Sequence, residues 1–171
     1  MTRSFLLPLV LASWTGACGD PVRDQARAAL GDEARGVPEG PLHRPGQPCL
    51  VCHDATGASA FSVAGTVYAR AAGGVPVDKV TVQLVDSAGR RFEARTNCAG
   101  NFFVRPSELA PQYPLWTTLS IGDKSIDMES PVFRDGSCAS CHTNPKGPAS
   151  AGEVYFLLDE DADLPATHYC K

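Results

Sequence analysis

The order of hydrophobic and polar positions predicts a chain built mainly from short β-strands. Residues 61–69 are rich in β-branched and aromatic side chains, and hydrophobic and polar residues alternate from Val80 to Leu84. A two-residue period of this kind is typical of a strand with one buried face. Five more segments have strand-like composition: residues 91–97, 101–104, 115–121, 124–128 and 153–158. Because turn residues separate these segments, the pattern predicts a mainly β, seven-stranded antiparallel sandwich.

The N-terminal region has a different pattern. Arg3 precedes an apolar run over residues 5–12, and small residues lead to Cys18. A positive end, a short apolar core and small residues are typical of an export signal that is too short to span a bilayer. The small residues resemble a bacterial lipobox, although Thr15 stands where Leu is usual. We therefore expect residues 1–17 to be a lipoprotein signal peptide and Cys18 to carry lipid; ordinary cleavage after Ala17 is the alternative.

Residues 18–48 are expected to form an N-terminal tether that contains one short helix. Asp20 is a suitable N-cap, Pro21 suits the first turn, and Gly31 suits the end of the helix. Four prolines, of which Pro48 is the last, follow Gly31 and predict a semi-extended segment rather than a packed element. Residues 49–171 form the predicted functional domain, with the sandwich at about 61–128 and a further strand at 153–158.

Two copies of one five-residue motif carry the chemistry of the chain. They are Cys49-Leu-Val-Cys52-His53 and Cys138-Ala-Ser-Cys141-His142. C-x-x-C-H is the attachment signature of c-type haem, because two thiols at this spacing can each form a thioether with one porphyrin vinyl group. The following imidazole is then placed to bind the iron, so His53 and His142 are the candidate proximal ligands.

This pattern resembles the bacterial multihaem c-type cytochromes. A low-spin electron-transfer haem needs a second axial ligand, usually His or Met. Met128 is the only methionine besides the initiator, whereas His43 and His168 are the two histidines left over. We therefore expect His43 and His168 to be the distal ligands of the two haems. In the alternative interpretation both are solvated surface residues.

The seven cysteines divide in a way that agrees with this hypothesis. Four belong to the haem motifs and Cys18 is assigned to lipid, which leaves Cys98 and Cys170. Two remaining cysteines in an oxidising compartment predict a disulfide. A bond that closes a loop of about 73 residues would contribute roughly 4 kcal/mol in the chain-entropy model.

The region between the motifs resembles a second family. Residues 64–68, 74–77, 80–84, 96–97 and 100–103 together are similar to a carboxypeptidase regulatory-like β-sandwich. The resemblance implies a transthyretin-like or immunoglobulin-like scaffold without catalytic residues, on which the two haem-binding segments pack. Asn97 departs from the family pattern, since Asp is usual at this position, and Cys98 follows it.

These features favour an electron carrier rather than an enzyme, located in the periplasm or at the outer cell surface. Two other functions stay open: a haem enzyme or sensor with an open iron position, and a zinc-binding structural protein that uses the four motif cysteines. Removing residues 1–17 changes the net charge from −4 to −5, with 14 basic and 19 acidic residues. This acidic balance argues against nucleic acid as a partner and is compatible with redox partner proteins and a lipid-anchored position at a membrane.

Overall fold

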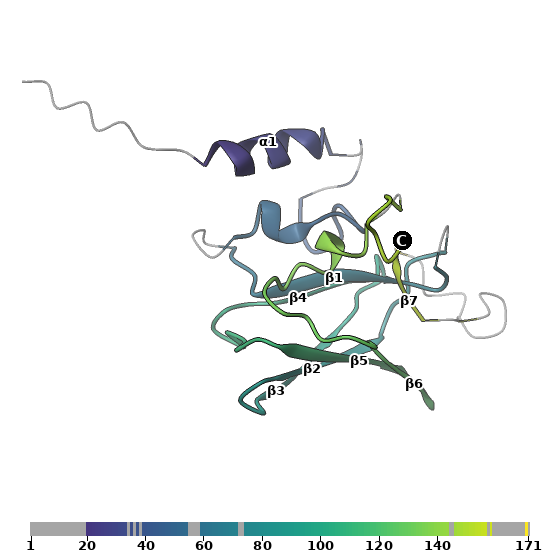
Figure 1. The fold of residues 1–171 in the computed structure, drawn as a ribbon. Coiled ribbons are helices and arrows are strands. Elements are labelled where there is room, and N and C mark those ends of the chain that lie inside the picture. The colour runs from purple at the N-terminus through teal and green to yellow at the C-terminus, as the bar shows by residue number, and fades with distance from the viewer. Residues whose placement is uncertain are drawn as a thin grey trace, which may run out of the picture.

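A computed structural model of the chain contains two β-sheets stacked face to face, with one helix above them (Figure 1). The structure describes residues 20–33, 35, 37, 39–54, 59–71, 74–143, 146–156, 158 and 170. The helix is α1 (Pro21–Ala29), and two 3-10 turns are η1 (Cys49–Val51) and η2 (Cys138–Ser140). The strands are β1 (Val63–Tyr68), β2 (Thr81–Asp86), β3 (Arg91–Arg95), β4 (Asn101–Val104), β5 (Leu115–Ile121), β6 (Lys124–Asp127) and β7 (Val154–Tyr155).

The strands form a three-stranded sheet in the order β4-β1-β7 and a four-stranded sheet in the order β3-β2-β5-β6. The prediction of a mainly β fold is confirmed. The prediction that every strand is antiparallel is wrong, because β1 and β7 are parallel, with Val67 opposite Val154. After β6 the chain still pairs with the four-stranded sheet at Val132, opposite Leu115, and then crosses to β1, where Ser137 lies opposite Ala64. It reaches β7 only after η2 (Figure 1). Parallel pairing requires a long connection of this kind.

Most strand positions agree with the hydrophobic pattern, and the seventh differs most. Residues 153–158 were predicted to form a strand, but β7 covers only Val154–Tyr155. Backbone hydrogen bonds nevertheless continue past its end, since Phe156 N donates to Tyr68 O at 2.8 Å and Leu158 N donates to Ala69 O at 3.1 Å. The short β7 therefore still fastens the C-terminal side of the chain to β1.

One hydrophobic core joins the two sheets. Val82 and Leu84 of β2 are fully buried and alternate with less buried residues, as the two-residue period predicts. Val63 and Val67 of β1 enter the same core from the three-stranded sheet. Every residue of β1 is buried, because this strand lies in the middle of its sheet and is covered on both faces. β1 is therefore the most constrained element of the fold.

Helix α1 begins and ends close to where the sequence predicts. The Asp20 side chain accepts hydrogen bonds from the N–H groups of Val22 and Arg23, both at 3.1 Å, as an N-cap does. The helix buries no residue, so polar contacts hold it: Arg27 Nε donates to Val51 O at 3.0 Å. In the described part of the chain no helix has the length and apolar character needed to cross a bilayer.

The proline-rich segment before the first motif is held against the sandwich over its second half. Asn101 Nδ2 donates to His43 O at 3.1 Å, and Gly46 N donates to Thr66 Oγ1 at 2.7 Å. Asn97 Nδ2 donates to Pro41 O at 2.7 Å, while its Oδ1 accepts from the backbone of the following turn. This differs from the expected free tether, and it accounts for Asn97, because an ionised Asp has no donor for the Pro41 carbonyl.

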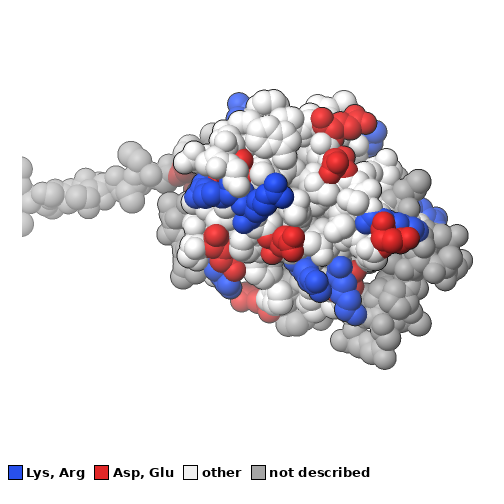
Figure 2. Space-filling view, turned by 90° about the horizontal axis from the view of Figure 1, so that it is seen from below, with Lys and Arg blue, Asp and Glu red and all other residues white. Residues whose placement is uncertain are grey.

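The outer face of the four-stranded sheet carries charges of both signs. Figure 2 shows this side, with basic and acidic side chains interspersed among uncharged ones. The exposed charged residues of β3 and β6 include Arg91, Glu93, Arg95, Lys124 and Asp127. Gln83 Nε2 donates to Glu93 Oε1 at 3.3 Å across the strands, and Thr118 Oγ1 donates to Asp127 Oδ1 at 2.6 Å. The two motif turns lie on the opposite side of the molecule, above β1 (Figure 1).

Candidate haem-binding site

The two C-x-x-C-H motifs have the same local structure. In the first, the N–H groups of Cys52 and His53 donate to Cys49 O at 3.2 and 2.9 Å. The corresponding residues of the second motif make the same two bonds at 3.2 and 2.8 Å. Both begin with a 3-10 turn, and the second cysteine of each has αR backbone angles. Segments far apart in the sequence therefore present two thiols and one imidazole in the same way.

Both motif histidines are oriented by a backbone carbonyl. His53 Nδ1 lies 2.8 Å from Ser59 O, and His142 Nδ1 lies 2.8 Å from Gly152 O. A carbonyl oxygen only accepts, so in the neutral form of each ring Nδ1 carries the proton and Nε2 keeps its lone pair. Metal-ligating histidines in proteins show this arrangement, in which the second ring nitrogen is fixed by a hydrogen bond. This orientation leaves Nε2 of each imidazole as the candidate metal ligand.

Strand β1 brings the two motifs together. Ala64 N donates to Gly136 O at 3.0 Å, and Ala64 forms an isolated parallel bridge with Ser137, just before the second motif. Both η1 and η2 contact β1. Gly65 provides the space, because a Cβ atom there would lie 2.8 Å from the Cβ and Sγ atoms of Cys138. The sequence alone did not establish this proximity.

The four motif thiols fall into an inner and an outer pair. Cys49 and Cys138, the first cysteine of each motif, are half-buried, whereas Cys52 and Cys141 are exposed. Burial, together with the nearby Cys49 thiol, raises the pKa of Cys138 to about 12. Burial also raises the pKa of Cys49. The inner thiols are therefore protonated near neutral pH, and the Cys49 thiol lies close enough to raise the pKa of Cys138.

An aspartate supports the second motif, and the sequence analysis did not identify it. Asp135 accepts from Ser137 N and from Ser140 Oγ, both at 2.8 Å, so its carboxylate spans the start of η2. Gly136 follows it, and a Cβ there would lie 2.0 Å from Ser62 O. The Asp-Gly-Ser sequence before Cys138 could have indicated a capped turn. The close approach of Gly136 to β1 has no local signal.

Of the two candidate distal ligands, His43 lies beside the first motif. Its ring centroid is 5.7 Å from that of His53, with 40° between the ring planes. His43 Nδ1 hydrogen-bonds to Gly40 O, so its Nε2 is also left free. The other candidate, His168, lies outside the described residues, as does Cys18.

Cys170, the predicted disulfide partner of Cys98, is among the described residues, and the predicted disulfide is present. Cys98 and Cys170 are joined by a disulfide that links residues 72 positions apart in the sequence. The bond attaches the end of the chain to the turn between β3 and β4. The described end of the chain is therefore fixed to the same turn that Asn97 organises.

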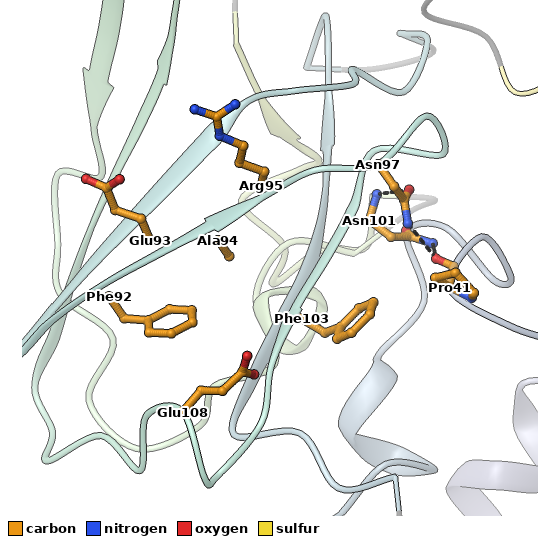
Figure 3. Close-up of a pocket in the computed structure, with 9 residues that line it drawn as sticks. All are labelled: Pro41, Phe92, Glu93, Ala94, Arg95, Asn97, Asn101, Phe103 and Glu108. Carbon is orange, nitrogen blue, oxygen red and sulfur yellow. Dashed lines mark hydrogen bonds between the residues drawn. The ribbon is translucent and has the colours of Figure 1, made fainter.

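A row of stacked rings extends from the first motif. His53 stacks on Phe61, and Phe61 stacks on Phe103 of β4. Beyond the row, Phe103 borders a hollow of about 320 Å³. Its lining residues are Pro41, Phe92, Glu93, Ala94, Arg95, Asn97, Asn101, Phe103 and Glu108, and Figure 3 shows the Asn97 and Asn101 amides directed at Pro41. No motif residue reaches this hollow, so it is separate from the attachment site.

A larger hollow of about 660 Å³ touches both motifs. Arg23 and Ala26 of α1 form one side, and Leu50 and Val51 of the first motif border it. Ser140 of the second motif lies at the same hollow, which Phe61 also lines. No motif cysteine or histidine lines it. This hollow therefore lies beside both turns and is bounded by helix α1, which polar contacts hold.

Comparison with known proteins adds no relative. No family model matches the chain, and no match was found among curated proteins or solved structures. Among the residues that the structure describes, no three His, Cys, Asp or Glu side chains are grouped so that they could hold a metal ion by themselves. The arguments for function therefore rest on the motifs and on their geometry.

Proposed function

We propose that this protein transfers electrons by means of two c-type haems, attached at Cys49/Cys52 and at Cys138/Cys141. The observation that supports this most is the structural repetition of the two motifs. Each forms the same turn, has one half-buried and one exposed thiol, and fixes its histidine through Nδ1 at 2.8 Å from a backbone carbonyl. A shared geometry in two distant segments indicates a shared ligand.

The residues present suit haem attachment. All four motif cysteines are free thiols, which thioether formation requires. His53 and His142 both offer an unprotonated Nε2, the form of imidazole that binds iron. Bound haem supplies one-electron redox chemistry, and the protein contributes the axial ligands, their hydrogen bonds and the burial that set the reduction potential.

The position of His43 favours the first haem as its partner. Two imidazoles that bind opposite faces of one metal ion through nitrogen–metal bonds of ~2 Å have ring centroids about 6 Å apart. The observed 5.7 Å between His43 and His53 is close to this spacing. His168 is then left for the second haem. Two bis-histidine irons have no open position, which suits an electron carrier rather than an enzyme.

The shared contact with β1 favours a compact pair of haems. Cys49 and Cys138 would each carry one thioether, and the Cys49 thiol is near enough to raise the pKa of Cys138. Haems joined to neighbouring sulfur atoms would lie near each other, which allows an electron entering at one to reach the other. Cys98–Cys170 and the β7 hydrogen bonds keep the surrounding scaffold rigid.

For the scaffold and the location, we retain the sequence hypotheses as part of the proposal. The sandwich would be of the transthyretin-like or immunoglobulin-like type, and its two sheets of three and four strands are compatible with this. Export is required for both the disulfide and haem attachment. The protein would be anchored at Cys18 to a membrane and would exchange electrons with redox partner proteins.

An optical and carbon monoxide binding experiment tests this function. The exported ferrous protein should show the pyridine haemochrome of haem c and should not bind carbon monoxide at either iron. His43→Ala should open one iron to carbon monoxide and leave the other closed. Carbon monoxide binding by the wild type at both irons would instead support an open-site sensor or enzyme. Stoichiometric zinc without haem would support the structural zinc protein.

A further inference from the structure

The two candidate haem ligands do not have equivalent surroundings, and one of the differences is an aromatic residue. We infer that Phe61 is a positioning residue that fixes the ring plane of His53, so that the first haem has a defined axial geometry which the second does not share. This inference rests on the proposed function, since it concerns the orientation of an iron ligand. It adds a role for a residue outside both C-x-x-C-H motifs.

The first observation is a stack of three rings. The centroids of His53 and Phe61 are 4.3 Å apart with 21° between their planes, and those of Phe61 and Phe103 are 4.7 Å apart with 19°. Stacked aromatic pairs with such spacing contribute attraction beyond their buried area. The guanidinium of Arg105 lies 5.9 Å from the Phe103 centroid, where a cation is attracted to the ring face. The stack therefore has a fixed base in β4.

The second observation is that Phe61 is itself tied to the histidine. Phe61 N donates to His53 O at 3.0 Å, and His53 Nδ1 lies 2.8 Å from Ser59 O. The ring of His53 thus has one hydrogen bond in its plane and one flat contact on its face. A hydrogen bond alone lets an imidazole rock about the bond axis. The added face contact removes this freedom, so the two together define the ring plane.

The second motif has the hydrogen bond without the stack. His142 Nδ1 is bound by Gly152 O at the same 2.8 Å. Within the described part of the chain, the ring contacts involve His43, His53, Phe61 and Phe103 but not His142. The two motifs share the backbone bonds of their turns and differ in this ring contact. Phe61 is therefore a feature that distinguishes the surroundings of His53 from those of His142.

This difference has a spectroscopic consequence. In a low-spin ferric haem, the direction of the axial imidazole planes controls the splitting of the iron d orbitals and hence the EPR g-values. A fixed ring plane gives a narrow distribution of g-values, and a loosely held plane gives a broad one. The two haems should therefore give two distinguishable low-spin signals, of which the narrower belongs to the first motif.

The test compares EPR spectra of the full, haem-loaded protein in four forms: wild type, Phe61→Leu, Phe61→Tyr and Phe133→Leu. Phe61→Leu removes the ring and should shift or broaden one of the two signals while the other stays unchanged. Phe61→Tyr keeps the ring and should retain the wild-type signal. Phe133 is 70% exposed and lies outside the stack, so Phe133→Leu is the matched control and should change neither signal.

Intact mass distinguishes a failure of the proposed function from a failure of the positioning role of Phe61. A wild type without haem refutes the proposed function. Two haems in Phe61→Leu with both EPR signals unchanged refute the positioning role alone. If Phe61→Leu does not fold, Phe103→Leu provides the test instead, because it removes the ring that supports Phe61 without changing a residue that stacks on His53. It should broaden the same signal by a smaller amount, and an unchanged spectrum there overturns the inference.

Discussion

Gly65 of β1 and Cys138 of the second motif are in direct contact: a Cβ atom on Gly65 would lie 2.8 Å from both the Cβ and the Sγ atoms of Cys138. The same Cβ would lie 3.0 Å from Cε1 of Phe102. Real Cβ atoms essentially never approach other atoms closer than 3.0 Å. The absence of a side chain at position 65 is therefore a condition for the second motif to pack on the sheet.

Gly65→Ala should destabilise the protein and weaken haem attachment at the second motif. The added methyl group overpacks a site that has no free space, which costs about 1–3 kcal/mol. Gly147→Ala is the control, because the nearest atom to its added Cβ is Thr143 Oγ1 at 3.9 Å. Denaturant unfolding of the two variants gives the comparison. Equal midpoints would show that β1 and Cys138 are not in contact.

The haem-free protein should show unequal thiol reactivity within each motif. The thiolate is the reactive form, and burial raises the pKa of Cys138 to about 12. Exposed Cys141 should therefore be alkylated well before Cys138, and Cys52 before Cys49. A short iodoacetamide pulse between pH 7 and pH 10, followed by peptide mass mapping, measures this order. Equal rates for Cys138 and Cys141 would contradict the burial of the inner pair.

Asp86 should make the free energy of unfolding depend on pH in the acidic range. Its side chain is 2% exposed and accepts the N–H groups of Gln112 and Arg90 at 3.0 and 2.9 Å. The bond from Gln112 is the largest cause that lowers the pKa of Asp86, and those from Arg90 lower it further. A folded-state pKa below the ordinary 3.8 means that this stabilisation is present above pH 3.8 and is lost as pH falls through the folded value.

Asp86→Asn should accordingly unfold at lower urea concentration than the wild type at pH 7. The difference should shrink at pH 3, because this pH lies below the ordinary pKa of 3.8, where the unfolded chain already binds the proton. Urea midpoints of both proteins at the two pH values provide the measurement. A difference of the same size at both would mean that the charge of Asp86 plays no part.

The Cys98–Cys170 disulfide should stabilise the fold through the length of the loop that it closes. With a sequence separation of 72, the chain-entropy model gives roughly 4 kcal/mol. The double variant Cys98→Ser/Cys170→Ser should therefore unfold at a markedly lower denaturant concentration than the oxidised wild type. Wild type treated with a reductant should approach the variant. An unchanged midpoint in both would show that the bond is absent from the exported protein.

Local patterns were sufficient for most of the secondary structure. The alternation from Val80 to Leu84 corresponds to β2, and the composition of residues 101–104 and 115–121 corresponds to β4 and β5 with the same bounds. Asp20 and Pro21 correctly marked the start of α1. In each case the signal is carried by neighbouring residues, through side-chain period or through a cap.

Long-range contacts could not be predicted in this way. The proline-rich segment was expected to be a tether because composition reports only local stiffness, whereas Asn97 and Asn101 hold it from β4 and its preceding turn. The parallel register of β7 depends on the path of the chain after β6 and on two residues that have no pattern of their own. Cys138 packs against Gly65, although the two residues lie far apart in the sequence and no local pattern indicates the contact.

In the candidate site too, the sequence predicted the residues with a local signal and missed those without one. The motif residues and His43 were predicted from identity and spacing, because haem attachment requires particular side chains at particular intervals. The Ser59 and Gly152 carbonyls that orient the histidines were not predicted, since any residue can supply a carbonyl. Phe61 was assigned only to the first strand, although its ring stacks on His53.

The central claim is that each motif carries one covalently bound haem, and intact mass spectrometry under denaturing conditions tests it most directly. Denaturation removes non-covalent ligands and metal ions, whereas thioether-linked haem stays attached. The exported protein should exceed the mass of its processed polypeptide by two haems, and replacing Cys52 and Cys49, or Cys141 and Cys138, with Ala should remove one. A polypeptide mass with no haem at either motif would contradict the proposed function.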